Sequence, residues 1–270
     1  MTNKPLVKFV TRSDIRTAVL RALATGSRPA QDLVSDLPLS RSGIYNGLDE
    51  LSDCDLIGRA RQNSGDDDWY LTSAGQLVVD QLNRQEWVET LLGDREYWLN
   101  HDISGLPEKF RRRLPVLHDA DLLRNPDNDP RYLERYWVNR MPEATQLWIG
   151  SRVIHGPYAD ATTDQTAPDT ETRLIHHTPV LEQYFEQYST DPAEFVASRP
   201  DSLNERVWHL PCSFMLTEEL FTLSFPLSDG TYDQDSVLVG RDEATLRFGD
   251  DFFRFYWEQA TPLKKYLDQR

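Results

Sequence analysis

Lysine is scarce in this sequence of 270 residues. Only five of its 29 basic residues are lysines, at positions 4, 8, 109, 264 and 265, and the other 24 are arginines. Aspartate dominates the acidic residues, with 28 aspartates against 16 glutamates, and the formal net charge is −15. A surface rich in aspartate and poor in lysine is typical of proteins that stay soluble in concentrated salt, where like charges are screened. The composition therefore predicts a salt-loving cytoplasm as the source.

Long apolar runs are also missing. The longest ones, such as Ala18–Leu20, are far shorter than the roughly 20 residues that span a bilayer. Residues 1–10 lack the apolar segment and the cleavage site of a secretory signal. The two cysteines, Cys54 and Cys212, lie far apart and define neither a disulfide framework nor a zinc site. These absences predict a reduced cytoplasmic protein that binds no metal and enters no membrane.

Familiar catalytic motifs are absent as well. The sequence has no glycine-rich nucleotide loop, no nucleophile elbow, no zinc-protease helix and no paired-cysteine motif. A site of the phospholipase D type needs a histidine followed two residues later by a lysine. None of the six histidines, at positions 101, 118, 155, 176, 177 and 209, has a lysine there. The sequence therefore predicts no catalytic residue and no cofactor.

Charge is distributed unevenly along the chain. Residues 12–61 carry seven arginines and seven acidic residues, whereas residues 94–270 carry 19 basic and 31 acidic residues, a net charge of −12. The composition of the sequence changes near Gly93, so we expect two domains, at residues 1–93 and 94–270. Because the first domain holds the least acidic stretch, it is the part that can tolerate a polyanion.

The first domain shows helical patterns followed by strands. Ser13 and Ser40 each precede apolar residues at helical spacing and can cap a helix, while Pro29 opens another and Gly26 ends the first. The expected elements are three short helices, strands at 56–61 and 69–71 around a polar turn, and a long helix capped by Thr72 or Ser73 and ending near Leu92. This order is that of an α+β winged helix-turn-helix.

The third of these helices has an outward face suited to the DNA major groove. Ile44, Leu48 and Leu51 define its inward face. The opposite face carries Arg41, Ser42, Tyr45, Asn46 and Asp49. Arginine can bind guanine with two hydrogen bonds, asparagine can pair with adenine, and a helix N-terminus offers free N–H groups to phosphate. Gly43 and Gly47 would let the helix lie close to a neighbouring helix or to the DNA backbone.

The pattern therefore predicts double-stranded DNA as a partner. Ser40, Arg41, Ser42, Tyr45 and Asn46 are the expected base and backbone contacts, and we expect Arg28, Arg59 and Arg61 to contact phosphate. Two alternatives stay open. The helix can be an ordinary polar surface, or it can belong to an adaptor that binds protein. The acidic run at residues 66–68, at the tip of the expected wing, favours the adaptor because it repels phosphate.

The sequence of the second domain predicts an α/β domain. Strands are expected at 146–154, 173–177, 206–210, 214–216, 220–226 and 236–239, helices at 94–137, 179–188 and 242–259, and an exposed loop at 157–170. His176, His177 and Thr178 end a strand just before a helix, where such domains bind ligands. The candidate effector pocket comprises Trp148, Arg152, His176, Thr178 and Tyr256. The alternative is one packed and one exposed histidine.

Several stretches resemble a known family. Leu39–Tyr45, with Leu48–Leu51 and Asp55–Ile57, resembles the recognition helix of archaeal winged helix-turn-helix regulators, and Leu71–Gly75 resembles the turn that ends their wing. The second domain resembles the effector domain of the methanogenesis and filamentation regulators. The matching pieces are Leu106-Pro107, Arg111–Leu114, Leu220–Pro226, Asp229–Asp233 and Ala244–Trp257, with Phe248 where tryptophan is expected.

This resemblance implies a transcription regulator whose second domain senses an effector or binds a partner. The order of strands and helices also resembles the phospholipase-D-like fold of related archaeal sugar-sensing regulators, although a fold does not fix a function. Such regulators dimerise through the helix that follows the wing, so a homodimer reading two half-sites is expected. The enzyme alternative is a degenerate phosphodiesterase.

Overall fold

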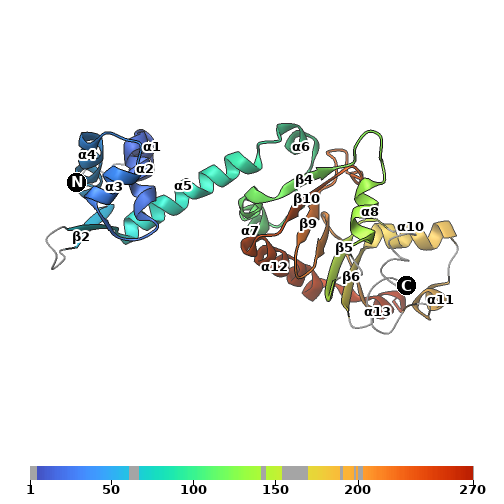
Figure 1. The fold of residues 1–270 in the computed structure, drawn as a ribbon. Helices are drawn as coiled ribbons and strands as arrows, with labels where there is room; N and C mark the ends of the chain where they lie inside the picture. The colour runs from blue at the N-terminus through green and yellow to red at the C-terminus, as the bar shows by residue number, and fades with distance from the viewer. Residues whose placement is uncertain are drawn as a thin grey trace. The chain divides into compact units, whose positions relative to one another are not determined.

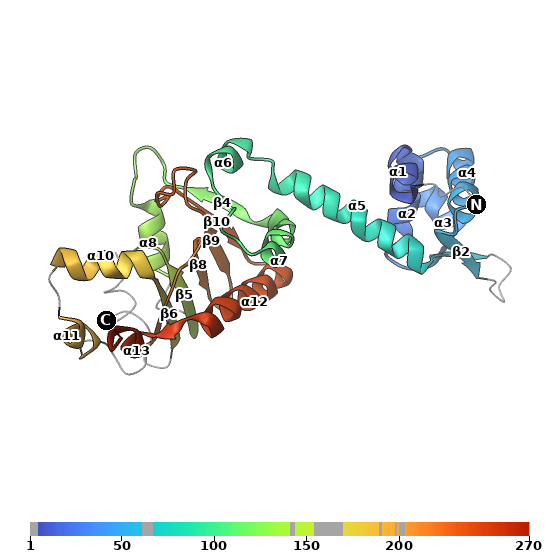
Figure 2. The ribbon, with the colours of Figure 1, turned by 180° about the vertical axis from the view of Figure 1, so that it is seen from behind.

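The computed structural model describes residues 5–60, 67–140, 144–153, 170–188, 191–197, 199 and 203–269. The chain divides into two compact units, Met1–Glu89 and Thr90–Arg270 (Figures 1 and 2). None of the helices in the described part of the chain combines the length and the apolar character needed to cross a membrane.

The N-terminal unit is a winged helix. Its helices are α1 (Leu6–Thr11), α2 (Asp14–Leu23), α3 (Ala30–Asp36), α4 (Arg41–Ser52) and α5 (Ser73–Leu91). Its strands β1 (Arg28–Pro29), β2 (Ile57–Ala60) and β3 (Asp68–Leu71) form an antiparallel sheet in the order β1-β3-β2. The expected helices and the β2–β3 hairpin are present, whereas α1 and the short strand β1 were not predicted.

Side-chain hydroxyls begin three of these helices. Ser13 Oγ accepts a hydrogen bond from Arg16 N, and Ser40 Oγ accepts one from Gly43 N at 3.2 Å. Before α5, Thr72 Oγ1 accepts from Gly75 N at 3.1 Å, so Thr72 rather than Ser73 is the cap. These bonds satisfy backbone donors that the first helical turn leaves free. The sequence signals for helix starts were therefore local and correct.

The C-terminal unit is built on one mixed sheet of eight strands in the order β11-β7-β6-β5-β8-β9-β10-β4. The strands are β4 (Asp121–Arg124), β5 (Gln146–Ser151), β6 (Glu171–His177), β7 (Leu203–Trp208), β8 (Ser213–Leu216), β9 (Phe221–Ser224), β10 (Ser236–Gly240) and β11 (Thr261–Pro262). Strands β5, β6 and β7 are parallel, and the other pairings are antiparallel.

Helices surround this sheet. They are α6 (Arg95–Asn100), α7 (Glu108–Arg111), the 3-10 helix η1 (Leu114–Asp119), α8 (Tyr132–Val138), α10 (Thr178–Tyr188), α11 (Pro192–Ala197), α12 (Glu243–Gln259) and α13 (Leu263–Leu267). Alternation along the strands decides which helix covers which face. Phe214 and Leu216 pack with Phe252 of α12, whereas Met215 between them packs with Leu133 and Trp137 of α8. Both faces of the sheet are therefore buried.

Part of the second domain differs from expectation. Residues 94–137 were expected to be helical, but Asp121–Arg124 form the edge strand β4. Leu122 lies opposite Leu238 of β10, and the neighbouring Leu123 packs in the core on the other face. A pair of leucines facing two cores is a strand pattern that is too short to recognise without its partner strand. Residues 154–169, which include most of the predicted loop, lie outside the described residues.

Candidate nucleic-acid interface

Helix α4 separates its apolar and polar residues onto two faces. Ile44, Leu48 and Leu51 are fully buried against the other helices of the unit. The opposite face is exposed and consists of Arg41, Ser42, Tyr45, Asn46, Asp49 and Glu50. The structure thus brings Arg41, Ser42, Tyr45 and Asn46 together on one surface, with the cap residue Ser40 at its start. The sequence predicted DNA contacts for these four residues and for Ser40.

Both glycines of α4 face α2 rather than solvent. A Cβ atom on Gly43 would lie 2.9 Å from Ile15 Cδ1, and one on Gly47 would lie 2.9 Å from Ile15 Cγ2. Contacts this short do not occur between real side chains, so glycine permits the close approach of α2 and α4. Of the two predicted roles for these glycines, close contact with a neighbouring helix is the one that the geometry accounts for.

Arg41 has no carboxylate partner among the residues that the structure describes. Its guanidinium lies 5.7 Å from the ring centroid of Tyr45, one helical turn later. Glu50, near the other end of α4, is paired with Arg16 of α2 at 2.6 Å. A helix N-terminus carries a partial positive charge from its free N–H groups. The start of α4 therefore combines a free arginine, a capping serine and a helix terminus that favours anions.

The two described wing and loop arginines are engaged locally. Arg28 lies 3.2 Å from Asp36, and Arg59 lies 3.6 Å from Asp67 with its guanidinium 4.4 Å over the ring of Trp69. The carboxylates are partly exposed, and such surface pairs contribute only about 0–1 kcal/mol. Both arginines can exchange their partner for phosphate at small cost. Arg61 and Asp66 lie outside the described residues.

The five candidate effector residues are not gathered in one place. Trp148 and Tyr256 are buried on the α12 face of the sheet, in the main core. His176 points to the other face, where its Nε2 lies 2.7 Å from Glu205. Arg152 and Thr178 follow the ends of β5 and β6. Alternation along β6 explains the separation, because Ile175, the residue before His176, belongs to the α12 core.

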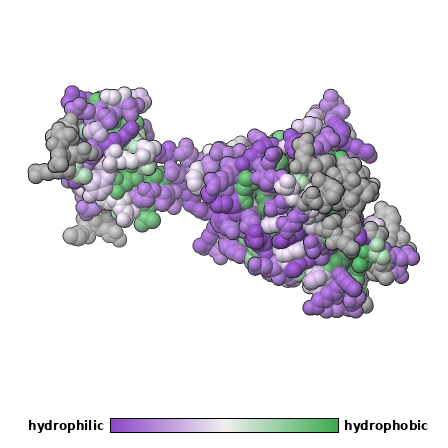
Figure 3. All heavy atoms as spheres, turned by 60° about the horizontal axis from the view of Figure 1, so that its bottom comes forward, coloured by the Kyte–Doolittle hydropathy of each residue, from purple (hydrophilic) through white to green (hydrophobic). Residues whose placement is uncertain are grey.

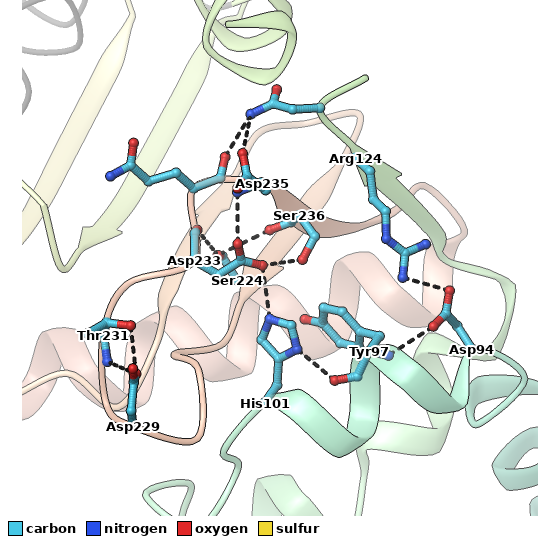
Figure 4. Close-up of polar contacts among 12 residues, drawn as sticks. Asp94, Tyr97, His101, Arg124, Ser224, Asp229, Thr231, Asp233, Asp235 and Ser236 are labelled. Atoms are coloured by element: carbon cyan, nitrogen blue, oxygen red, sulfur yellow. Dashed lines mark hydrogen bonds and ion pairs between the residues drawn. The ribbon is translucent and has the colours of Figure 1, made fainter. Parts of the chain in front are cut away.

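A buried polar cluster joins α6 to the loop between β9 and β10 (Figure 4). His101 Nδ1 lies 2.6 Å from the carbonyl oxygen of Tyr97, and its Nε2 lies 2.9 Å from Asp233 Oδ2. Ser236 donates to the same carboxylate, and Asp235 N donates to its other oxygen at 2.8 Å. Burial and the nearby Asp233 raise the pKa of Tyr97. These bonds fasten the first helix of the unit to its sheet.

Sequence reasoning did not single out His101 as part of a site. Asp233 lies within the run Asp229–Asp233 that carries part of the family resemblance, but 132 residues separate it from His101. Neither metal-ligand spacing nor a catalytic motif connects the two. Among the described residues, no group of three or more acidic, histidine or cysteine side chains is arranged to hold a metal ion.

The fold and the outward face of α4 define the class of the protein: a winged-helix protein in which one face of α4 is polar and exposed, the architecture of DNA-binding regulators. The family model described as the middle domain of the methanogenesis regulatory protein FilR1 matches residues 131–259. A second model, described as the HVO_A0261 N-terminal domain, matches residues 5–91. The chain is thus similar to the middle domain of FilR1 over one part of its length and to the HVO_A0261 N-terminal domain over another.

Individual proteins are also similar to parts or most of this chain. The methanogenesis regulatory protein FilR1 of Methanothrix harundinacea (strain 6Ac) is 21% identical over 267 residues, which cover 95% of this chain and 58% of the relative. The chain thus spans little more than half of that protein. The archaeal chromatin protein TrmBL2 aligns over 95% of this chain and 98% of its own, at 12% identity and a TM-score of 0.39. A MarR-family regulator from Enterococcus faecalis V583 covers 36% of this chain and 96% of its own, at 19% identity and a TM-score of 0.32.

Proposed function

We propose that this chain is a sequence-specific DNA-binding transcription regulator. The observation that carries the proposal is the outward face of α4, where Arg41, Ser42 and Asn46 are exposed while the inward face is fully buried. The match of residues 131–259 to the middle domain of a regulatory protein supports the same conclusion. The relative from Methanothrix harundinacea carries the name of a regulatory protein.

Each residue of this face has a distinct role in the proposal. Arg41 would bind a guanine edge with two hydrogen bonds, and Asn46 would pair with adenine, which are the contacts that discriminate bases best. Ser40, Ser42 and Tyr45 would hold the helix in register by bonding to phosphate or base edges. Arg28, Arg59 and Arg61 would contact the DNA backbone on either side. The structure describes all of these residues except Arg61.

The proposal includes a homodimer and an effector. A dimer supplies two reading helices for two half-sites. In α5, the side chain of Leu77 is 71% exposed and that of Trp87 is 37% exposed, which suits an element that packs against a second copy. The C-terminal unit would bind an effector or a protein partner, and its ligand must favour one dimer geometry over another to act. A phospholipase-D-like architecture and a haloarchaeal cytoplasm remain part of this proposal.

Figure 3 shows that the visible face of the C-terminal unit is mostly hydrophilic. Together with the net charge of −12 over residues 94–270, this favours the winged helix as the surface that meets DNA.

In-cell chromatin capture of the tagged chain tests the proposal under its native salt, since salt controls protein–DNA affinity. The variant Arg41→Ala/Asn46→Ala is compared with the control Arg247→Ala/Gln259→Ala, which removes one charge and one amide from exposed positions of α12. Discrete promoter peaks that persist in the control and vanish in the α4 variant are expected.

Two other outcomes have defined meanings. Peaks unchanged in the α4 variant would show that α4 does not read DNA. Absence of peaks for the unmodified chain would favour the adaptor, whose acidic wing tip includes Asp67 and Asp68. Hydrolysis of a phosphodiester by the purified chain would favour the degenerate phosphodiesterase.

A further inference from the structure

Three parallel strands end together at one edge of the large sheet. The last residues of β5, β6 and β7 are Ser151, His177 and Trp208, and the register pairs His177 with Trp208 and Ser151 with His176. By this register, Arg152 lies level with His177, and Thr178 lies level with His209 one residue further along. The carboxyl edge of parallel strands is where α/β sheets bind ligands, because the backbone there is free to form a site.

Arg152 is held in place at this edge by backbone carbonyl groups. Its Nη1 donates to the carbonyl oxygens of Leu210 at 3.2 Å and Pro211 at 3.0 Å, and its Nη2 donates to that of Gly230 at 3.4 Å. An arginine has five N–H donors, so two remain for another partner. No carboxylate of the described residues lies within ion-pair distance of it. The guanidinium is thus positioned by the fold while its charge is unneutralised.

His177 adds a buried donor beside this arginine. The residue as a whole is buried, with an exposed fraction of 5%. Nδ1 accepts a hydrogen bond from Leu210 N at 2.9 Å, so the proton of the neutral ring resides on Nε2. Nε2 has no partner in the described part of the chain. Burial, together with Arg152 and His209, lowers the pKa of His177 to about 4.

His209 completes the cluster with an exposed ring. Its centroid lies 4.7 Å from that of His177. Helix α10 starts at Thr178, directly after His177. Among the described residues, no acidic side chain forms an ion pair with Arg152, His177 or His209.

His176, the neighbour on the same strand, shows the contrast. Its Nε2 is paired with Glu205, which also lies 3.6 Å from Arg199. A structural histidine in this sheet is thus neutralised by a carboxylate, and His177 is not. A phosphate or carboxylate can supply the acceptor that the described residues do not offer to His177 Nε2.

We propose that Arg152, His177 and His209 form a binding site for the oxyanion group of a small effector, a phosphate or a carboxylate. The inference deepens the proposed function, on which it rests, by naming the chemistry of the effector and its place. It also revises the predicted pocket, keeping Arg152 and Thr178 and replacing His176 by His177. A phosphate or carboxylate would accept from the two free donors of Arg152 and from Nε2 of His177.

Nuclear magnetic resonance of the full chain with isotope-labelled histidine tests the site without DNA. Inorganic phosphate and acetate are titrated separately at constant ionic strength, with chloride as the balancing anion. The ring signals of His177 and His209 are expected to shift saturably with one or both oxyanions, while those of His118, which lies near Asp119 in η1, stay constant. The better of the two anions identifies the group.

Variants separate the site from general charge effects. Arg152→Gln is expected to weaken oxyanion binding by about tenfold or more, because it removes charged hydrogen-bond donors. The matched control Arg173→Gln removes an arginine that is paired with Glu171 on the same strand, and binding should change less than about twofold. If Arg152→Gln does not fold, as judged by its melting temperature, His209→Ala replaces it, since that ring is exposed.

Absence of saturable shifts in the unmodified chain, or an equal effect of Arg152→Gln and Arg173→Gln, would overturn the proposal. Shifts that follow chloride equally well would do the same. Failure of DNA binding leaves this titration unaffected, so the two proposals can fail independently.

Discussion

Helices α4 and α12 are both amphipathic, yet their outward faces treat arginine in opposite ways. On α12, Arg247 is paired with Glu243 at 2.5 Å and Arg254 with Asp250 at 2.7 Å, each one helical turn apart. On α4, the residue one turn after Arg41 is an aromatic one, Tyr45. The two arginines of α12 are paired with acids of the same helix, whereas α4 keeps an arginine available to a polyanion.

The same contrast recurs inside the C-terminal unit. His176 faces Glu205 on one side of the sheet, and His177 faces Arg152 and His209 at its edge. The start of α4 and the carboxyl edge of β5 and β6 are two places that hold an arginine, Arg41 and Arg152, without a carboxylate partner among the described residues. They are the places where we propose DNA and an oxyanion.

The largest expected effect concerns the inward faces of the two helices. Phe252→Ala removes a fully buried ring of α12 and should lower the free energy of unfolding of the C-terminal unit by about 3–5 kcal/mol. Leu48→Ala should lower that of the N-terminal unit by about 2–5 kcal/mol. Urea unfolding, monitored by hydrogen exchange in each unit, measures both changes in the free energy of unfolding. If the two units unfold separately, each variant leaves the other unit's stability unchanged; a common transition would contradict two separate domains.

The next effect concerns the pKa of His177, the second histidine of β6. The pKa of His177 is about 4 in the folded chain against 6.5 without burial, so the unfolded chain binds an extra proton between these values. The free energy of unfolding should therefore fall by about 3 kcal/mol as the pH is lowered from about 7 to about 4 through this group alone. The measurement compares the free energy of unfolding of the wild-type chain with that of His177→Asn over this pH range. Asparagine at position 177 keeps an acceptor for Leu210 N. If the free energies of unfolding of the two proteins change in parallel with pH, the pKa of His177 is that of an unburied histidine.

A smaller effect tests the free arginine of α4 directly. Tyr45→Glu places a carboxylate one turn after Arg41 and so gives α4 the kind of pair seen on α12. DNA affinity should fall by about tenfold or more, because the new charge both neutralises Arg41 and repels phosphate. The free energy of unfolding should change by less than about 0.5 kcal/mol, since the site is exposed. Fluorescence anisotropy with operator DNA measures this.

The reverse change on α12 is the control. Glu243→Gln frees Arg247 on the other unit, and DNA affinity should stay within about twofold. A gain in affinity from Glu243→Gln equal to the loss from Tyr45→Glu would mean that net charge, and not the α4 surface, governs binding.

The winged helix and its exposed face could be predicted because their signals are local. Ser40 caps α4 three residues ahead of its partner N–H, and the burial of Ile44, Leu48 and Leu51 follows from helical spacing alone. Contacts between distant residues were out of reach. The pairing of β4 with β10 and the bond from His101 to Asp233 join segments more than 100 residues apart. The different surroundings of His176 and His177 were out of reach for the same reason, since only the folded sheet shows which face holds Glu205.

The smallest effect tests whether Gly47 serves the contact of α4 with α2 or the surface proposed to face DNA. Alanine is about 1 kcal/mol better than glycine in a helix, but at position 47 its Cβ would meet Ile15 Cγ2 at 2.9 Å. Crowding of this kind costs about 1–3 kcal/mol, so Gly47→Ala should lower the free energy of unfolding of the N-terminal unit by about 1 kcal/mol. In an Ile15→Ala background the crowding is gone, and the same substitution should raise it by about 1 kcal/mol. Urea unfolding of the four proteins forms a double-mutant cycle that measures the coupling. An identical effect of Gly47→Ala in both backgrounds would mean that the glycine does not serve the contact between α2 and α4, and its role would then have to lie on the DNA side.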